Sequence, residues 1–176
     1  FNEVLLDDYM QGKLKDDELK LSLLMSMLDG FKGTLFRQTQ FAEFELKMHE
    51  AAEAGKPLTG KELSKMYSDI TNRYYGNDKG VCVVPEYIEM EWAYIPHFYY
   101  NFYVYQYSTS FVASQALAAE VLKGNKEATK KYMDFISSGS SDWAINTLKK
   151  AGVDMMSSVP FDKTIENMNK IMDEIE

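Results

Sequence analysis

The sequence is poor in cysteine and histidine. Its 176 residues include one Cys and two His. A single cysteine cannot form an internal disulfide, which is consistent with a reducing compartment. Cys82 lies in the apolar run VCVVP (Val81–Pro85). We expect this thiol to be inert, because apolar surroundings disfavour the reactive thiolate.

Metal-ligand pairs are also missing. The two histidines, His49 and His97, form no HxxxH pair, and no CxxC pair exists. Two His one turn apart on a helix can bind one zinc ion from the same helical face. Neither histidine has such a neighbour, so the chain by itself offers no recognisable set of zinc ligands.

Positive charge is scarce too. The chain has 19 Lys and Arg against 27 Asp and Glu, for a net charge of −8. Nucleic acids and anionic membrane surfaces both attract clustered Lys and Arg, so we expect neither as a partner. The longest weakly polar run, Ser110–Leu122, contains Gln115 and Glu120 and falls short of the ~20 residues that span a bilayer.

What the chain does contain predicts a globular, almost wholly helical protein. Apolar residues make up 45% and aromatic residues 14% of it, enough for one core of ordinary domain size. Acidic residues at Asp16 and Asp17, a capping box over Thr59–Glu62 and an Asn at position 125 are typical helix starts. The predicted helices are Phe1–Gln11, one from Asp16 with a possible break at Gly30 or Gly33, Leu35–Glu53, Thr59–Arg73, one ending at Leu122, Lys126–Ile136, Trp143–Lys150 and Lys163–Glu176.

β-structure should be slight or absent. The only stretch with β character is Val81–Pro85, and we expect it to be an extended connector, since one short run does not make a sheet. The fold class is therefore all-α.

The densest group of aromatic residues is Ile95–Phe111, IPHFYYNFYVYQYSTSF, with one His and five Tyr. Each buried phenol needs a hydrogen-bond partner, so the segment resembles either the wall of a polar cleft or a hydrogen-bonded core helix. His97, Tyr100, Val104 and Tyr107 follow one another at i, i+3, i+7 and i+10, which places them on one face if the segment is helical.

Four blocks of the sequence carry a family resemblance. They are Phe1-Asn2-Glu3 with the following LLDDY, FRQTQFAEFE (Phe36–Glu45), IPHFYYNFYVYQY (Ile95–Tyr107) and LKKAGVDM (Leu148–Met155). Together they resemble the C-terminal part of the oligoendopeptidase F branch of the zinc oligopeptidases, the group that includes thimet oligopeptidase. The resemblance implies an all-α, multi-helix half of a zincin-type catalytic domain.

The resemblance also implies an activity and a cofactor. It predicts a cytoplasmic zinc metalloendopeptidase that hydrolyses short oligopeptides. Relatives bind zinc through an HExxH helix and a further Glu, and both would lie upstream of Phe1. Residues 1–176 are then expected to be the C-terminal portion of a single catalytic domain, partnered by an N-terminal remainder of the same protein and inactive alone.

The same resemblance suggests roles for individual residues. Tyr107 and His97 would be the catalytic pair that donates hydrogen bonds to the oxyanion formed during peptide hydrolysis. Tyr103 or Tyr105 would take the place of Tyr107 if the register shifts. The expected substrate-binding residues are Tyr100 and Tyr103, and Glu3 would orient a zinc-ligating His from behind.

For four further residues we expect structural roles. Arg37, Glu43 and Glu45 should form buried ion pairs between helices, and His49 should lie at the surface near a helix end. The alternative function is a non-catalytic, all-helical module that binds a peptide in an aromatic groove. A purely structural helical domain is a third possibility.

Overall fold

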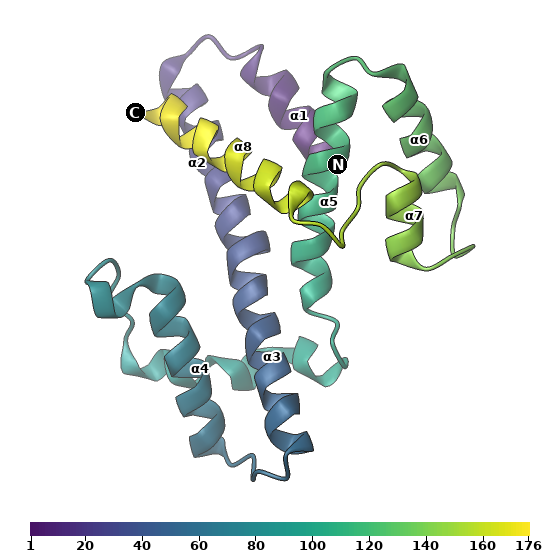
Figure 1. Cartoon of the computed structure of the whole chain (residues 1–176). Helices are drawn as coiled ribbons and strands as arrows, with labels where there is room; N and C mark the ends of the chain where they lie inside the picture. The colour runs from purple at the N-terminus through teal and green to yellow at the C-terminus, as the bar shows by residue number, and fades with distance from the viewer. The chain divides into compact units, whose positions relative to one another are not determined.

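The computed structural model describes all 176 residues and contains helices but no β-strand (Figure 1). The predicted all-α fold class is confirmed. The chain forms two compact units, one of Phe1–Lys32 with Thr109–Glu176 and the other of Gly33–Ser108. None of the helices has both the length and the apolar character needed to cross a bilayer.

The helical elements account for most of the chain. The α-helices are α1 (Asn2–Gln11), α2 (Asp17–Gly30), α3 (Arg37–Glu53), α4 (Gly60–Tyr75), α5 (Tyr105–Leu122), α6 (Lys126–Ser137), α7 (Ala144–Lys150) and α8 (Val159–Ile175). The π-helical segment η1 covers Phe31–Phe36. The 3₁₀ segments are η2 (Asn77–Lys79), η3 (Glu86–Tyr94) and η4 (Pro96–Tyr99).

Three helix starts follow the local signals in the sequence. The Asp16 side chain accepts the Leu19 N–H at 2.9 Å, and the Thr59 hydroxyl accepts the Glu62 N–H at 3.3 Å. The Asn125 side chain accepts from the N–H groups of Glu127 and Ala128. Each cap satisfies a backbone N–H that has no partner within the helix. The predicted starts of α2, α4 and α6 are confirmed.

One local expectation holds only in part and two are wrong. At the possible break near Gly30 and Gly33 the chain stays helical, but α2 ends at Gly30 and the π-helical segment η1 separates it from α3. Helix α8 starts at Val159, before the predicted Lys163, since a proline in the first turn costs no helical hydrogen bond. Cys82 is exposed and not enclosed by its valine neighbours.

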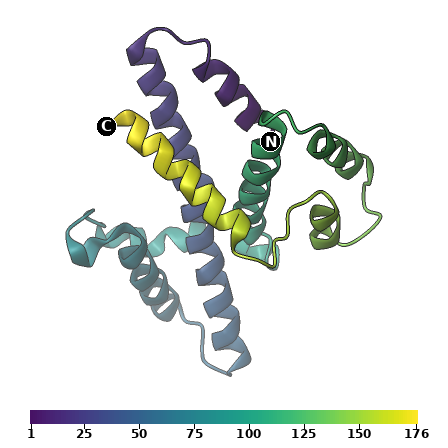
Figure 2. The same ribbon diagram turned by 45° about the horizontal axis from the view of Figure 1, so that its top comes forward.

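The first unit joins the two ends of the chain. Helix α2 packs against α8, and α6 lies against α7. In Figure 2 the yellow helix α8 crosses α2. The core beside α5 contains Ala113, Leu117, Ala151 and Val153.

The second unit is built on a helical hairpin of α3 and α4, which Figure 1 shows side by side. Segment η3 packs along α4. The core consists of Phe41, Phe44, Leu63, Tyr67, Ile70 and Val104.

Polar side chains tie η3 to this hairpin. Glu91 of η3 forms an ion pair with Arg37 of α3 and accepts a hydrogen bond from the hydroxyl of Tyr67 of α4. Glu43 of α3 pairs with Arg73 of α4 at 2.5 Å. The predicted ion pairs of Arg37 and Glu43 therefore form, but the expectation that they are buried is wrong, since Arg37 keeps 32% and Arg73 58% of its side-chain exposure.

Candidate active site

The segment expected to be one aromatic helix is divided into two elements. Segment η4 ends at Tyr99, a turn follows, and α5 begins at Tyr105. The predicted single helical stripe is therefore wrong: Tyr100 is exposed, whereas Val104 is fully buried. On a continuous helix, ten residues would separate His97 from Tyr107 by ~15 Å along the axis. The turn folds the chain back and brings the two side chains together.

Buried neighbours fix both sides of this turn. On η4, Phe98 packs edge-on against Phe41 and Phe44, with ring centroids 5.9 Å and 5.2 Å apart. At the start of α5, the buried Ser108 donates to the Leu35 carbonyl at 3.2 Å and accepts from Thr39 at 3.0 Å. His97 and Tyr107 each lie directly next to one of these anchored residues.

Four of the predicted site residues form one group, the tyrosine–histidine cluster: His97, Tyr100, Tyr103 and Tyr107. The Nε2 atom of His97 lies 3.1 Å from the Tyr107 hydroxyl oxygen. The His97 ring stacks on Tyr103 with centroids 5.9 Å apart and planes at 18°. Tyr103 in turn meets Tyr107 edge-on at 5.6 Å and Tyr100 at 6.2 Å.

The cluster is open to solvent on one side, since Tyr107 is 36% exposed and Tyr100 is 64% exposed. Partial desolvation raises the pKa of Tyr107 above its ordinary value of 10.0, and a hydrogen bond with Tyr103 raises it further. The phenol therefore keeps its proton at neutral pH and can donate a hydrogen bond to an oxygen atom that enters the cluster.

The turn itself has unusual backbone geometry. Asn101 and Phe102 have φ values of 39° and 60°, in the left-handed region that L-residues avoid. This conformation costs roughly 1–2 kcal/mol per residue, the least for Asn. The Phe102 N–H donates to Oε1 of Glu45 on α3 at 2.7 Å, and Glu45 is only 1% exposed. The expectation of an ion pair for Glu45 is wrong, because this carboxylate binds a backbone amide.

The structure also places His49 and Glu3, two residues for which the sequence suggested a role or a position. The expected surface residue His49 is half-buried, with its ring 4.4 Å from that of Phe102. Glu3 is exposed on α1, in the other unit, where its charge adds to desolvation in raising the pKa of Asp7.

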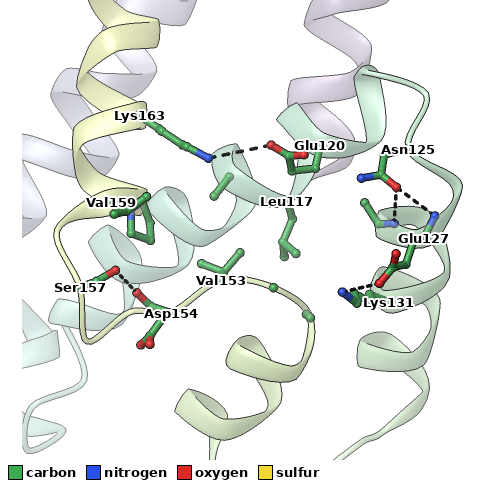
Figure 3. A pocket seen from close by; sticks show the side chains of 15 residues that line it. Leu117, Glu120, Asn125, Glu127, Lys131, Val153, Asp154, Ser157, Val159 and Lys163 are labelled. Carbon is green, nitrogen blue, oxygen red and sulfur yellow. Dashed lines mark hydrogen bonds and ion pairs between the residues drawn. The ribbon is translucent and has the colours of Figure 1, made fainter.

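A pocket lies in the other unit. Helices α5, α6 and α8, with the segment Ala151–Ser157 that follows α7, line this pocket of about 410 Å³ (Figure 3). Its charged residues are already paired: Glu127 with Lys131 at 2.8 Å, Asp154 with Lys149 at 2.7 Å, and Glu120 with a lysine on either side. Since its charges satisfy one another, this pocket is a weaker candidate for catalysis than the cluster.

The chain contains no group of three His, Cys, Asp or Glu side chains that could hold a metal ion. His97 is engaged with Tyr107, and His49 packs on Phe102. The residues present therefore do not fit a zinc site, and the chemistry assigned to this chain rests on its hydrogen-bond donors.

Sequence reasoning missed Glu45 and Phe102 as parts of the site. Glu45 is 57 residues away from Phe102, and neither residue type signals such a contact. The one available clue was that Glu45 falls in the same family-like block as Arg37 and Glu43.

The chain is similar to known proteins over nearly all of its length. The model of Peptidase family M3 matches residues 1–167. Oligopeptidase PepF of Bacillus subtilis (strain 168) is 46% identical over 99% of this chain, which covers 26% of that protein. The plasmid oligoendopeptidase F of Lactococcus lactis subsp. cremoris is 45% identical over 99% of this chain and 29% of its own length.

Solved structures show the same similarity. Oligoendopeptidase-F from Enterococcus faecium matches 99% of this chain with a TM-score of 0.91 and 43% identity, and the match covers 33% of that chain. A putative peptidase from Chlamydophila abortus matches with a TM-score of 0.89 and 40% identity, over 29% of its chain. The present chain thus spans about a quarter to a third of the length of these relatives.

Proposed function

The chain belongs to peptidase family M3, and from this we propose that it forms the substrate-binding and oxyanion-stabilising part of a zinc-dependent oligoendopeptidase. The similar proteins carry the names oligopeptidase and oligoendopeptidase, which supports short peptides as substrates. The observation that carries the proposal is the 3.1 Å approach of His97 Nε2 to the Tyr107 hydroxyl.

The proposed chemistry follows from these two side chains. When the carbonyl of the scissile peptide bond is attacked, its oxygen gains negative charge. Donors aligned with that oxygen lower the barrier. With its proton on Nε2, His97 donates to the Tyr107 oxygen, and the phenol hydrogen of Tyr107, which is otherwise directed to Tyr103, turns to the substrate.

The rings around this pair suit a peptide ligand. Tyr103 stacks on His97 and meets Tyr100 edge-on, and both tyrosines are exposed. We assign them to substrate binding, because tyrosine combines a flat apolar surface with a hydrogen-bonding tip. Glu3 retains its proposed role of orienting a metal-ligating His, a role that requires residues outside this chain.

Zinc, in this proposal, is bound by residues of the full-length protein that precede Phe1. This chain has no ligand cluster of its own, and it covers only part of each similar protein. Zinc supplies the activation of the attacking nucleophile. The proposed partners are thus an oligopeptide and the N-terminal remainder of the same protein, and the proposed location is the cytoplasm.

The alternative is a peptide-binding module without catalysis, which the exposed tyrosines together with the missing metal ligands favour. Hydrolysis of a quenched fluorescent oligopeptide by the full-length protein separates the two functions. Cleavage that a zinc chelator abolishes and added zinc restores supports the peptidase. Binding of the same peptide with no cleavage under any metal condition supports the module.

A further inference from the structure

The turn from Tyr100 to Val104 joins the two elements that carry His97 and Tyr107. His97 lies on η4 and Tyr107 on α5, and each element is fixed to the core by its own buried residues. The direction in which the chain travels between them depends on the left-handed residues Asn101 and Phe102. Such conformations persist only where surrounding contacts hold them, and they concentrate at functional sites.

Glu45 supplies the contact to the backbone of this turn. Its Oε1 atom accepts the Phe102 N–H at 2.7 Å. A hydrogen bond from an amide to a carboxylate is shorter and stronger than one between neutral groups. Burial of the carboxylate is unfavourable unless hydrogen bonds compensate for the lost water, and Glu45 is almost completely buried.

His49 supplies the contact to the side chain. It follows Glu45 by four positions on α3, so both side chains lie on one face of that helix. The His49 and Phe102 rings are 4.4 Å apart at 35°. One face of α3 therefore contacts both the backbone N–H and the ring of Phe102.

We propose that Glu45 and His49 form a clamp on α3 that positions the His97–Tyr107 pair by holding the left-handed turn at Asn101–Phe102. Both are positioning residues, since neither reaches the reacting atoms itself. The inference rests on the proposed function for its catalytic consequence, whereas the hold on the turn is a property of the fold alone.

The test compares Glu45→Ala and Glu45→Gln in the full-length protein. Hydrogen exchange of the turn amides, followed by mass spectrometry, reports on the clamp whether or not peptides are hydrolysed. We expect Glu45→Ala to accelerate exchange in the turn by at least about tenfold. Glu45→Gln should keep most of the protection, because the amide oxygen of Gln still accepts the Phe102 N–H.

Peptide hydrolysis then shows whether the held turn matters for catalysis. Displacement of catalytic groups by about 1 Å can cost about 10²-fold in rate. We therefore expect Glu45→Ala to lower kcat 10- to 100-fold at nearly unchanged KM, and Glu45→Gln to restore most of it. His49→Ala should lower kcat by a smaller factor. His49→Phe should restore kcat, because it keeps a ring against Phe102.

Glu43→Ala is the matched control. It removes a carboxylate from the same helix, where Glu43 pairs with Lys47 and Arg73 and leaves the turn untouched. Unchanged turn exchange in Glu45→Ala would overturn the clamp, as would an equal effect of Glu43→Ala. Faster exchange with an unaltered kcat would overturn the positioning role. If the wild-type protein cleaves no peptide, the proposed function fails, while the exchange data still decide the clamp.

Discussion

His97 Nε2 and the Tyr107 hydroxyl lie 3.1 Å apart, although the two residues belong to different elements. Their approach depends on the sharp turn between η4 and α5. Neither side chain is held by its own element alone, so the pair is sensitive to substitutions in the turn, in the aromatic core and in the rings that pack beside it.

Replacement of His97 tests the imidazole half of the pair. His97→Ala removes the partner of the Tyr107 hydroxyl and the ring stacked on Tyr103. We expect kcat to fall by about 10² and KM to rise, since the donor to Tyr107 and the ring that supports the substrate-binding Tyr103 are lost together. Steady-state hydrolysis of a fluorescent oligopeptide measures both. His97→Gln, which keeps an N–H donor, should lose less, and an equal loss would contradict the role as donor.

Tyr103→Phe tests how the cluster sets the acidity of Tyr107. The ring contacts with His97 and Tyr107 remain, but the hydroxyl that helps to raise the pKa of Tyr107 is lost. We expect the pKa of Tyr107 to move down toward 10.0, as followed by carbon NMR of labelled tyrosine. Tyr99→Phe, at an 84% exposed position, is the control and should leave that pKa where it is.

The titration of Tyr67 should make the stability of the fold depend on pH in the alkaline range. Burial, and then its hydrogen bond and charge interaction with Glu91, raise the pKa of Tyr67 well above its ordinary value of 10.0. The unfolded phenol ionises near pH 10 while the folded one stays neutral, so the unfolded state loses protons first. The free energy of unfolding should therefore fall as the pH rises above about 10. Denaturant unfolding should show a shallower fall in Tyr67→Phe, and an identical pH dependence would contradict the assignment.

Replacement of Phe44 tests how much the core of the second unit contributes to stability. It is fully buried and packs on Phe98, the neighbour of His97. Phe44→Ala should cost about 3–5 kcal/mol in the free energy of unfolding. Phe36→Ala, at an exposed position, should change it by less than about 0.5 kcal/mol. Urea titration measures the free energy of unfolding of both variants. Equal losses would contradict the central place of Phe44 in the core.

The parts of the fold that sequence predicted correctly are those fixed by local interactions. Asp16, Thr59 and Asn125 each cap a helix by bonding an N–H two or three residues away, so their positions can be inferred from neighbouring residues. The grouping of His97 with three tyrosines was also foreseeable, because the four residues lie within one short segment.

The geometry of the site could not be predicted in this way. Periodicity indicated one helix from His97 onward, and Pro96 directly before it is compatible with a helix start. What ends the helical pattern is the bond from Phe102 to Glu45, across 57 residues, together with the burial of Val104 in the core of the hairpin. Tertiary contacts of this kind override local helix preference.

The most direct test of the account is kcat of Tyr107→Phe in the full-length protein. Because the pKa of Tyr107 lies above 10.0, its phenol is a neutral donor throughout the neutral range. We predict that kcat falls by about 10²–10³ at every pH from about 6 to about 9, with KM and thermal stability almost unchanged. A variant that hydrolyses peptides at the wild-type rate would contradict the role of Tyr107 in stabilising the oxyanion.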